Sequence, residues 1–556
     1  MKAHSHRRVS VSVFAALTTV TLLASPASNA ASPPGTPHVT VGADIKQLLF
    51  DWDDVTGAAY YRLLVQVGTG AFKPLIDNIP ASSTQVRLSI ADHVLSWTLT
   101  HYAVAACNTS GCTNSAPLSP QNLMLDSIGY FKASNTETGD TFGELVLSDD
   151  GRTLAVVASS EDSNATGVND NQASNSSAGS GAVYVFRRTS DGWRQEAYLK
   201  AGVNQPGQSF GTTYSEITGK AIAINAKGSL LAVGASRQNV AGIPEAGVVY
   251  IYQKSASGSL SLAATLNSPN PHSLNNFGGS LDMSLDGRTL KVTEIDPPPF
   301  ESALPRFRTH IFIRPGTVWQ ASASFVQFRP IDFCGRTRLS RDGNTLVFLC
   351  INPILMTELL YTVKRSGNTW TLVSDQTPAE MGGKGLALDF DATTMAIQQL
   401  EDTDDHRRLV GIFRWTGSSW VREATIPAPP IPDALGSLDF GKNVELSLTG
   451  NMLAIGDPLA SEGGAGISPA SKPGTESRGA VYIWRRNDRN STTWLMRSVV
   501  KSPNPGQGDD FGISLSMCST GHALAIGADG EDSKAKGVDG DRTDNSSTDS
   551  GAAYLY

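Results

Sequence analysis

The chain has 556 residues, with 44 basic and 52 acidic side chains and a formal net charge of −8. A nucleic-acid-binding protein needs a basic stripe, so this charge argues against nucleic acid as a partner. The length predicts several domains or one large repeat array, and the many Gly and Pro residues predict many turns.

The first 30 residues have the pattern of a secretory signal peptide. Lys2, Arg7 and Arg8 precede the apolar run VSVSVFAALTTVTLLA, and Ser28-Asn29-Ala30 offers small residues for cleavage. A membrane anchor is the weaker alternative, because the run is short and Ser25-Pro26 follows it. We therefore predict an exported protein without a membrane span, located in the periplasm, at the cell surface or in the medium.

A Pro-rich linker (residues 31–37) leads into a small β-rich region at residues 38–120. Trp52 ends one apolar run, Tyr60 and Tyr61 start the next, and Tyr102 stands at the start of a later run. The region resembles a fibronectin type III module, in which Trp52 would be the core tryptophan of the second strand. The resemblance implies a spacer or a binding platform.

Five cysteines fit an exported protein. Cys107 and Cys112 flank the turn Asn-Thr-Ser-Gly, which predicts a local disulfide. Cys334 and Cys350 flank a hairpin, and counting outward from its Asp-Gly turn places them nearly opposite each other, as a disulfide requires. Cys518 is left over and is expected to be a buried thiol.

A unit of four β-rich runs recurs from residue 126 to residue 556. Its first copy contains GELVLS, TLAVVAS, GAVYVF and EAYLKA, and the Asp-Gly that follows GELVLS is a strong hairpin signal. One such sheet cannot bury its own faces, but copies packed radially can, as in a β-propeller. Two degraded units and five units marked by Phe-Gly pairs give seven copies; the pairs are Phe142-Gly143, Phe210-Gly211, Phe277-Gly278, Phe440-Gly441 and Phe511-Gly512.

The two ends of the array are complementary. The chain stops at GAAYLY, a third run, whereas the array begins with IGYFKAS, which matches the fourth runs EAYLKA and SVVKSP. The first segment is therefore expected to complete the last blade and to remove the exposed sheet edges. The predicted fold class is all-β: a seven-bladed β-propeller (126–556) preceded by a small fibronectin type III-like β-sandwich.

The repeats resemble the bacterial FG-GAP repeat family, which is related to the β-propeller of integrin α subunits. KASNTETGDTFG in the first unit and KSPNPGQGDDFG in the seventh carry the resemblance. It implies an exported propeller used in adhesion or ligand binding, with calcium in the loops of some members. Here the connections between first and second strands are tight turns such as SDDGRT instead of integrin-type calcium loops, and there is no Arg-Gly-Asp tripeptide.

The long connections all fall between strands two and three or between successive sheets, which emerge on one face of a propeller. Binding residues tend to lie on loops held by a rigid scaffold, so we expect a ligand on this face. Two loops of equal length start at Glu161 and Glu531, and the second concentrates Asp539, Asp541 and Asp544. Closely spaced carboxylates are ligands that calcium prefers, which makes these three residues a candidate calcium site; a solvated polar loop is the alternative.

Enzyme signatures are scarce, since the chain has no His-Glu-x-x-His, Gly-x-Ser-x-Gly or Gly-Lys-Ser/Thr motif. We therefore expect a non-enzymatic monomer for recognition or adhesion that binds a protein or a glycan, with no catalytic residue assigned. The alternative is a hydrolase or lyase that acts on a polysaccharide at the central mouth of the propeller. Acid and base side chains converging at the axis would favour the enzyme, and a shallow long-loop face would favour binding.

Overall fold

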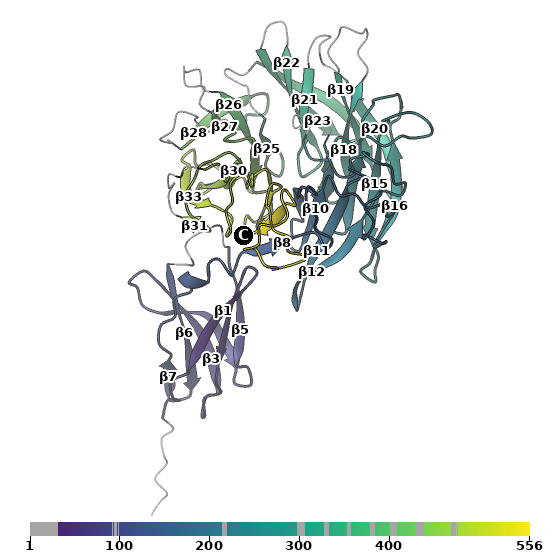
Figure 1. Cartoon of the computed structure of the whole chain (residues 1–556). Coiled ribbons are helices and arrows are strands. Elements are labelled where there is room, and N and C mark those ends of the chain that lie inside the picture. Colours follow the sequence, from purple (N-terminus) through teal and green to yellow (C-terminus); the bar gives the residue numbers. More distant parts are fainter. Residues whose placement is uncertain are drawn as a thin grey trace, which may run out of the picture.

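The computed structural model of the chain describes residues 32–556, apart from residues 92, 94–96, 98, 214–218, 297–305, 327, 329–332, 353–356, 378–383, 401–407, 430–438, 469–473 and 475. The predicted signal peptide lies outside these residues. The regular structure is nearly all β-strand (Figure 1), with a short 3-10 helix η2 (Gln121–Leu123). Within the described ranges, no helix is long and apolar enough to cross a membrane.

The N-terminal region is a sandwich of two antiparallel sheets. The first has the order β1-β2-β5, with β1 (Val39–Asp44), β2 (Gln47–Trp52) and β5 (Gln85–Ser89). The second has the order β4-β3-β6-β7, with β3 (Tyr60–Val67), β4 (Lys73–Pro80), β6 (Thr100–Asn108) and β7 (Gly111–Asn114). Alternate residues of β2 point inward, because side chains alternate across a strand. Trp52 is among them and packs on Tyr61 with ring centroids 5.2 Å apart, so its predicted place in the core is confirmed.

The rest of the chain forms a series of antiparallel sheets, which confirms the prediction of a β-propeller. In chain order these sheets are β9 (Phe142–Leu147), β10 (Thr153–Ala158), β11 (Ala182–Thr189) and β12 (Gly192–Leu199); β13 (Ile222–Ile224), β14 (Leu230–Ala235), β15 (Val248–Lys254) and β16 (Leu260–Asn267); β17 (Ser280–Met283), β18 (Thr289–Asp296), β19 (Arg306–Ile313) and β20 (Gln320–Phe325); β21 (Phe333–Leu339), β22 (Thr345–Asn352), β23 (Thr357–Ser366) and β24 (Thr369–Gln376); β25 (Leu386–Leu388), β26 (Thr394–Leu400), β27 (Arg408–Trp415) and β28 (Trp420–Pro427); β29 (Asn443–Leu446), β30 (Met452–Asp457), β32 (Ala480–Arg485), β33 (Leu495–Val500) and β31 (Ile467–Ser468); and β34 (Ser514–Met517), β35 (Leu524–Ala528), β36 (Ala552–Leu555) and β8 (Gly129–Phe131).

The first strands of the sheets meet around a common axis. Neighbouring first strands contact each other in the sequence β9, β13, β17, β21, β25, β29, β34 and back to β9. The strands of each sheet then run outward from this ring, so each sheet packs its faces against the sheets on either side. This is the packing that a single small sheet needs to bury its apolar residues.

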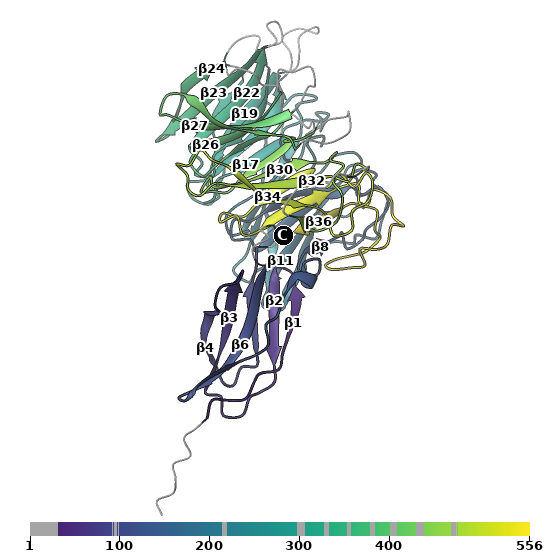
Figure 2. The same ribbon diagram turned by 90° about the vertical axis from the view of Figure 1, so that its left-hand side faces the viewer.

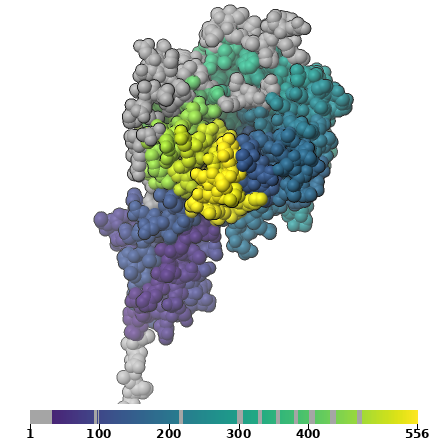
Figure 3. Space-filling view, in the orientation of Figure 1, coloured from purple at the N-terminus to yellow at the C-terminus, as the bar shows by residue number. Residues whose placement is uncertain are grey.

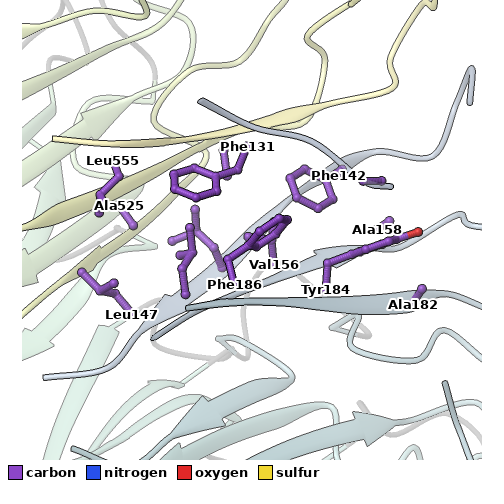
Figure 4. Packing of buried hydrophobic residues seen from close by; sticks show 14 of the residues in the cluster. Phe131, Phe142, Leu147, Val156, Ala158, Ala182, Tyr184, Phe186, Ala525 and Leu555 are labelled. Carbon is purple, nitrogen blue, oxygen red and sulfur yellow. The ribbon is translucent and has the colours of Figure 1, made fainter. Parts of the chain in front are cut away.

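The array closes as its two ends predict. Strand β8 pairs antiparallel with β36, with Tyr130 opposite Tyr554 and Phe131 opposite Ala553. Phe131 packs edge-on against Phe186 of the next sheet at 5.1 Å, and Figure 4 shows both rings in one cluster with Phe142 and Leu555. The N-terminal strand of the array therefore covers the edge that the C-terminal strand would otherwise expose.

The sandwich packs against the larger domain where this closure occurs. Figures 1 and 2 show it projecting from the end of the molecule that carries the C-terminus, and Figure 3 shows the surfaces in contact. Ile45 joins the apolar cluster of the closure, and the Lys46 amide donates to the Ser127 carbonyl at 2.8 Å. His93 is buried against Met452, with Nε2 3.4 Å from the sulfur.

Candidate functional site

The Phe-Gly pairs place one residue per unit at the axis. All five phenylalanines are fully buried, which anchors the start of each first strand. The glycines allow close approach to the preceding sheet: a Cβ on Gly211 would lie 2.8 Å from Val157, and one on Gly441 would lie 2.8 Å from Val410. Four of the five residues that follow these pairs line one central cavity: Glu144, Thr212, Lys442 and Ile513.

This cavity has a volume of about 280 Å³. Its remaining lining comes mostly from the starts of first strands and the ends of second strands: Thr141, Ser159, Thr213, Gly219, Lys220, Arg336, Thr337, Arg338, Lys384, Gly385, Leu386, Asn443, Val444, Ser514 and Asp529. These strand ends belong to the face of the long connections, so the cavity opens where a ligand was expected.

Two carboxyl groups, those of Glu144 and Asp529, line the cavity. Glu144 is half-buried, and its Oε1 accepts a hydrogen bond from the Ala221 amide at 3.1 Å. Asp529 follows β35, and it approaches because Gly143 has no side chain; a Cβ at Gly143 would lie 2.8 Å from the Asp529 Cβ. Burial raises the pKa of Glu144 to about 7, opposed by Lys220, and burial raises the pKa of Asp529 to about 6.

Basic side chains line the same cavity. Lys220 donates from Nζ to the Leu145 carbonyl at 2.9 Å, and burial lowers its pKa to about 8. Arg338 donates to Asp282 at 3.0 Å and to the Leu386 carbonyl at 3.0 Å. Lys220 and Arg338 also line a second hollow of about 50 Å³ deeper along the axis.

Acid and base groups therefore converge at the axis, which is the arrangement that favours the enzyme over the binding module. At a pH between these values, Glu144 with a pKa of about 7 is mostly protonated, whereas Asp529 with a pKa of about 6 is mostly ionised. Two carboxyl groups with separated pKa values can serve as a general acid and a general base.

The three aspartates predicted to bind calcium make separate hydrogen bonds. Asp539 accepts from the Tyr130 amide at 3.1 Å, Asp541 accepts from the Thr543 amide at 2.9 Å, and Asp544 accepts from the Ser546 amide at 2.8 Å. Among the described residues, no group of three or more His, Cys, Asp and Glu side chains is placed to hold a metal ion. Calcium binding by this loop stays a prediction.

The two long loops share a sequence pattern, and each begins with a buried glutamate that forms an ion pair. Glu531 starts one loop and is buried against Lys132 of the β8 segment, with Nζ and Oε2 2.8 Å apart. Glu161 starts the other loop and pairs in the same way with Lys200, at 2.6 Å. Each glutamate thus fixes its loop to the outermost strand of its sheet.

The structure places both predicted cysteine pairs at disulfide distance. The sulfur atoms are 2.07 Å apart in Cys107–Cys112, which joins β6 to β7, and 1.98 Å apart in Cys334–Cys350, which joins β21 to β22. Cys518 is a buried free thiol, as expected.

Sequence reasoning missed Glu144 and Asp529. In the frame of the Phe-Gly pairs, Glu144 stands where the last unit has Ile513. In the frame of the Glu-Asp-Ser motif that starts the long loops, Asp529 stands where the first unit has Ser159. The signal was therefore a charged residue at a position where two otherwise similar repeats differ.

No protein-family model matches the chain, and no curated protein matches it either. Solved structures share the fold at low identity. The Pseudomonas aeruginosa periplasmic gluconolactonase PpgL is 13% identical over 80% of this chain and 98% of its own, with a TM-score of 0.37. A Bacteroides uniformis protein assigned as a 6-phosphogluconolactonase is 10% identical over 80% and 98%, with a TM-score of 0.38. Sqt1 of Chaetomium thermophilum is 11% identical over 77% and 96%, with a TM-score of 0.41.

These comparisons correct one expectation. The prediction of a non-enzymatic protein is corrected, since two of these three structures are named as lactonases. The absence of a sequence motif was a poor guide, since catalytic groups in a propeller converge from distant sheets. At 10–13% identity the comparisons describe the fold alone and identify no activity for this chain.

Proposed function

We propose that this chain is a hydrolase that cleaves glycosidic bonds of a polysaccharide at the central mouth of the propeller. The observation that carries the proposal is the pair of carboxyl groups in the cavity, Glu144 and Asp529. At a pH between their pKa values of about 7 and about 6, Glu144 is mostly protonated and Asp529 is mostly ionised. Paired carboxyl groups of this kind perform most glycoside hydrolysis.

Each carboxyl group has one role in the proposed reaction. The protonated Glu144 gives its proton to the glycosidic oxygen as the bond to the anomeric carbon breaks. The ionised Asp529 takes a proton from a water molecule, whose oxygen forms the new bond to that carbon. Glu144 is left ionised and Asp529 protonated, and proton exchange with solvent restores the pair.

The size and the polarity of the cavity support a carbohydrate chain end as the substrate. About 280 Å³ is at the small end of ligand pockets, which span about 300–1,000 Å³. Thr141, Thr212 and Thr213 supply hydroxyl groups to the lining, and Lys384 and Lys442 supply donors for sugar hydroxyl or carboxylate oxygens.

The test is release of reducing ends from a panel of neutral and uronate-containing polysaccharides at pH 6.5. The Glu144→Gln variant keeps the acceptor for the Ala221 amide but cannot donate a carboxyl proton, so activity should fall by about 10²- to 10⁴-fold. Asp529→Asn should lose a similar factor, whereas Arg194→Gln, an exposed residue outside the cavity, should stay within a few-fold of the parent. No release from any substrate, or equal release by the parent and both acid variants, would contradict the proposal.

We also propose the finer assignments that the repeats suggest. Each of the sheets from β9 onward is one of seven blades, the Phe-Gly units are FG-GAP-like, and the N-terminal sandwich is a fibronectin type III-like module. The buried Phe-Gly anchors support the second assignment, and the β1-β2-β5 and β4-β3-β6-β7 sheets around Trp52 support the third. Two disulfide pairs support export to an oxidising compartment.

A further inference from the structure

A third hollow lies between the sandwich and the propeller, and it shares no lining residue with the central cavity. It has a volume of about 300 Å³ and lies between the sandwich and the β11–β12 hairpin. Its lining comprises Asp44, Ile45, Gln47, Arg87 and Ser89 from the sandwich and Arg152, Arg188, Thr189, Ser190, Gly192 and Trp193 from the first propeller sheet.

The hollow has an excess of positive charge. Three guanidinium groups line it, against the single carboxylate of Asp44. That carboxylate is already engaged: its Oδ2 pairs with Arg87 at 3.1 Å, and its Oδ1 accepts from the Ile45 amide at 2.7 Å. Within the described residues, no carboxylate forms an ion pair with Arg152 or Arg188.

The two remaining arginines are held close to each other by the fold. The Arg188 amide donates to the Arg152 carbonyl at 2.9 Å, so their backbones are neighbours. Arg188 is half-buried, and this burial, followed by the charge of Arg152, lowers its pKa, opposed by the charge of Asp44. A purely structural arginine would gain a carboxylate partner, whereas these two face a polar hollow.

We propose that this hollow binds a sugar that carries a sulfate or phosphate ester. The planar guanidinium groups of Arg152 and Arg188 match the oxygens of a tetrahedral oxyanion, which arginine binds through paired hydrogen bonds. The volume of about 300 Å³ is larger than a small inorganic ion needs, since one water molecule occupies about 30 Å³ in the liquid. The anionic group is therefore expected to be part of a larger molecule. The proposal does not depend on the acid pair at the central mouth.

A bound anion would connect the two domains. Arg87 belongs to the sandwich, and Arg152 and Arg188 belong to the propeller, so one ester group can contact both. A ligand that binds only the folded, docked form raises the melting temperature by mass action. The site would therefore couple recognition of a charged glycan to the docking of the sandwich.

The experiment is isothermal titration calorimetry and thermal melting of residues 32–556 with four probes: N-acetylglucosamine 6-sulfate, N-acetylglucosamine 6-phosphate, unmodified N-acetylglucosamine and inorganic sulfate. All samples are brought to one ionic strength with sodium chloride. We expect saturable binding of at least one ester, a higher melting temperature, and at least tenfold weaker binding of inorganic sulfate and of the unmodified sugar. The stronger of the two esters identifies the anion.

Variants distinguish a specific binding site from a nonspecific electrostatic effect. Arg152→Gln and Arg188→Gln should each weaken the ester at least tenfold, while Arg194→Gln, an exposed arginine of the same hairpin outside the hollow, should not. Asp44→Asn keeps the acceptor for the Ile45 amide and removes the only carboxylate, so it should tighten binding. Non-saturable shifts, equal shifts in Arg188→Gln and Arg194→Gln, or inorganic sulfate binding as tightly as both esters would overturn the proposal.

Discussion

At the scale of single residues, the chemistry of the central mouth depends on where charged groups replace the apolar or hydroxyl residues of the repeat. Glu144 follows a Phe-Gly pair whose phenylalanine is fully buried, so its backbone position is fixed by packing. Asp529 is close to it only because Gly143 leaves room for the aspartate backbone. The glycine therefore has a positional role in the proposed acid pair.

A substitution tests this role of Gly143. In Gly143→Ala the added Cβ would meet the Asp529 backbone nitrogen and Cα at 2.9 Å, so Asp529 must shift away from Glu144. Overpacking of this kind destabilises by about 1–3 kcal/mol, and we expect hydrolysis to fall more than the melting temperature alone explains. Gly316→Ala is the control, because a Cβ there meets nothing within 4 Å. Gly143→Ala with the parent's turnover would show that the two carboxyl groups need not be adjacent.

At the scale of elements, much of the fold could be predicted because its signals lie within short stretches of the sequence. Hairpin turns such as Asp149–Arg152 carry their own signal, since Gly151 adopts a positive φ and Asp150 accepts from the Arg152 amide. The closure by β8 was also predictable, because YFKAS repeats the sequence of other fourth strands. The acid pair was not, because Glu144 and Asp529 are 385 positions apart and only ring closure brings them together.

The buried pair of Lys132 and Glu531 should be essential for closure. Lys132 also donates to the Ser550 hydroxyl at 2.8 Å, so β8 is tied to the loop that precedes β36. Removing one partner of a buried ion pair costs about 3–5 kcal/mol, because the other charge is left without compensation. Lys132→Met should therefore melt at a markedly lower temperature.

The matched control for Lys132→Met is Lys200→Met, which breaks the equivalent Lys200–Glu161 pair inside the first propeller sheet. Both variants should lose similar stability, but only Lys132→Met should expose the edge of β36 and aggregate in light scattering. Deleting residues 127–134 should have the same effect more strongly. If neither the deletion nor Lys132→Met increases aggregation, β8 does not protect that edge.

The Cys334–Cys350 disulfide should stabilise the β21–β22 hairpin. It closes a loop of about 15 residues, for which the chain-entropy model gives about 3 kcal/mol. The pair joins adjacent strands of one sheet, so the Cys334→Ser/Cys350→Ser variant should keep its fold and melt lower than the parent. Mass spectrometry of the exported protein should find both cysteines oxidised; free thiols at both positions would contradict the bond.

At the scale of the whole molecule, the sandwich is docked through His93, which should make stability depend on pH. Burial, followed by the charge of Lys46, lowers the pKa of His93 to about 3, and His522 acts in the same direction. An unfolded chain binds this proton near pH 6.5, whereas the folded chain does not until about pH 3. The contribution is therefore complete above about pH 6.5 and is lost as the pH falls, by about 1.4 kcal/mol per unit.

Thermal melts at pH 7 and pH 5 measure this effect. The parent should lose more stability between these values than His93→Gln, which has no proton to take up. His101→Gln, an exposed histidine of the same sandwich, should behave like the parent. An equal loss in the parent and in His93→Gln would mean that the docking of the sandwich does not depend on a neutral His93.

The whole molecule also shows that sequence patterns predict the lengths of loops better than the arrangement of the side chains within them. The long connections emerge on one face, as their lengths counted along the chain predict, and the central cavity opens on that face; binding of a ligand there stays a prediction. Two of the predicted loop aspartates, Asp541 and Asp544, each accept a hydrogen bond from a residue two positions away. Their spacing in sequence resembles a ligand set, but local turn hydrogen bonds use the same carboxylates.

The pH dependence of kcat/KM for reducing-end release is the most direct measurement of the proposed acid–base pair. With Asp529 titrating at about 6 and Glu144 at about 7, we predict a narrow bell-shaped profile with its maximum between these values. The rate should rise as Asp529 ionises and fall as Glu144 loses its proton, and Glu144→Gln should remove the alkaline limb. A rate that is flat from pH 5 to pH 8, or an alkaline limb that survives in Glu144→Gln, would contradict catalysis by these two carboxyl groups.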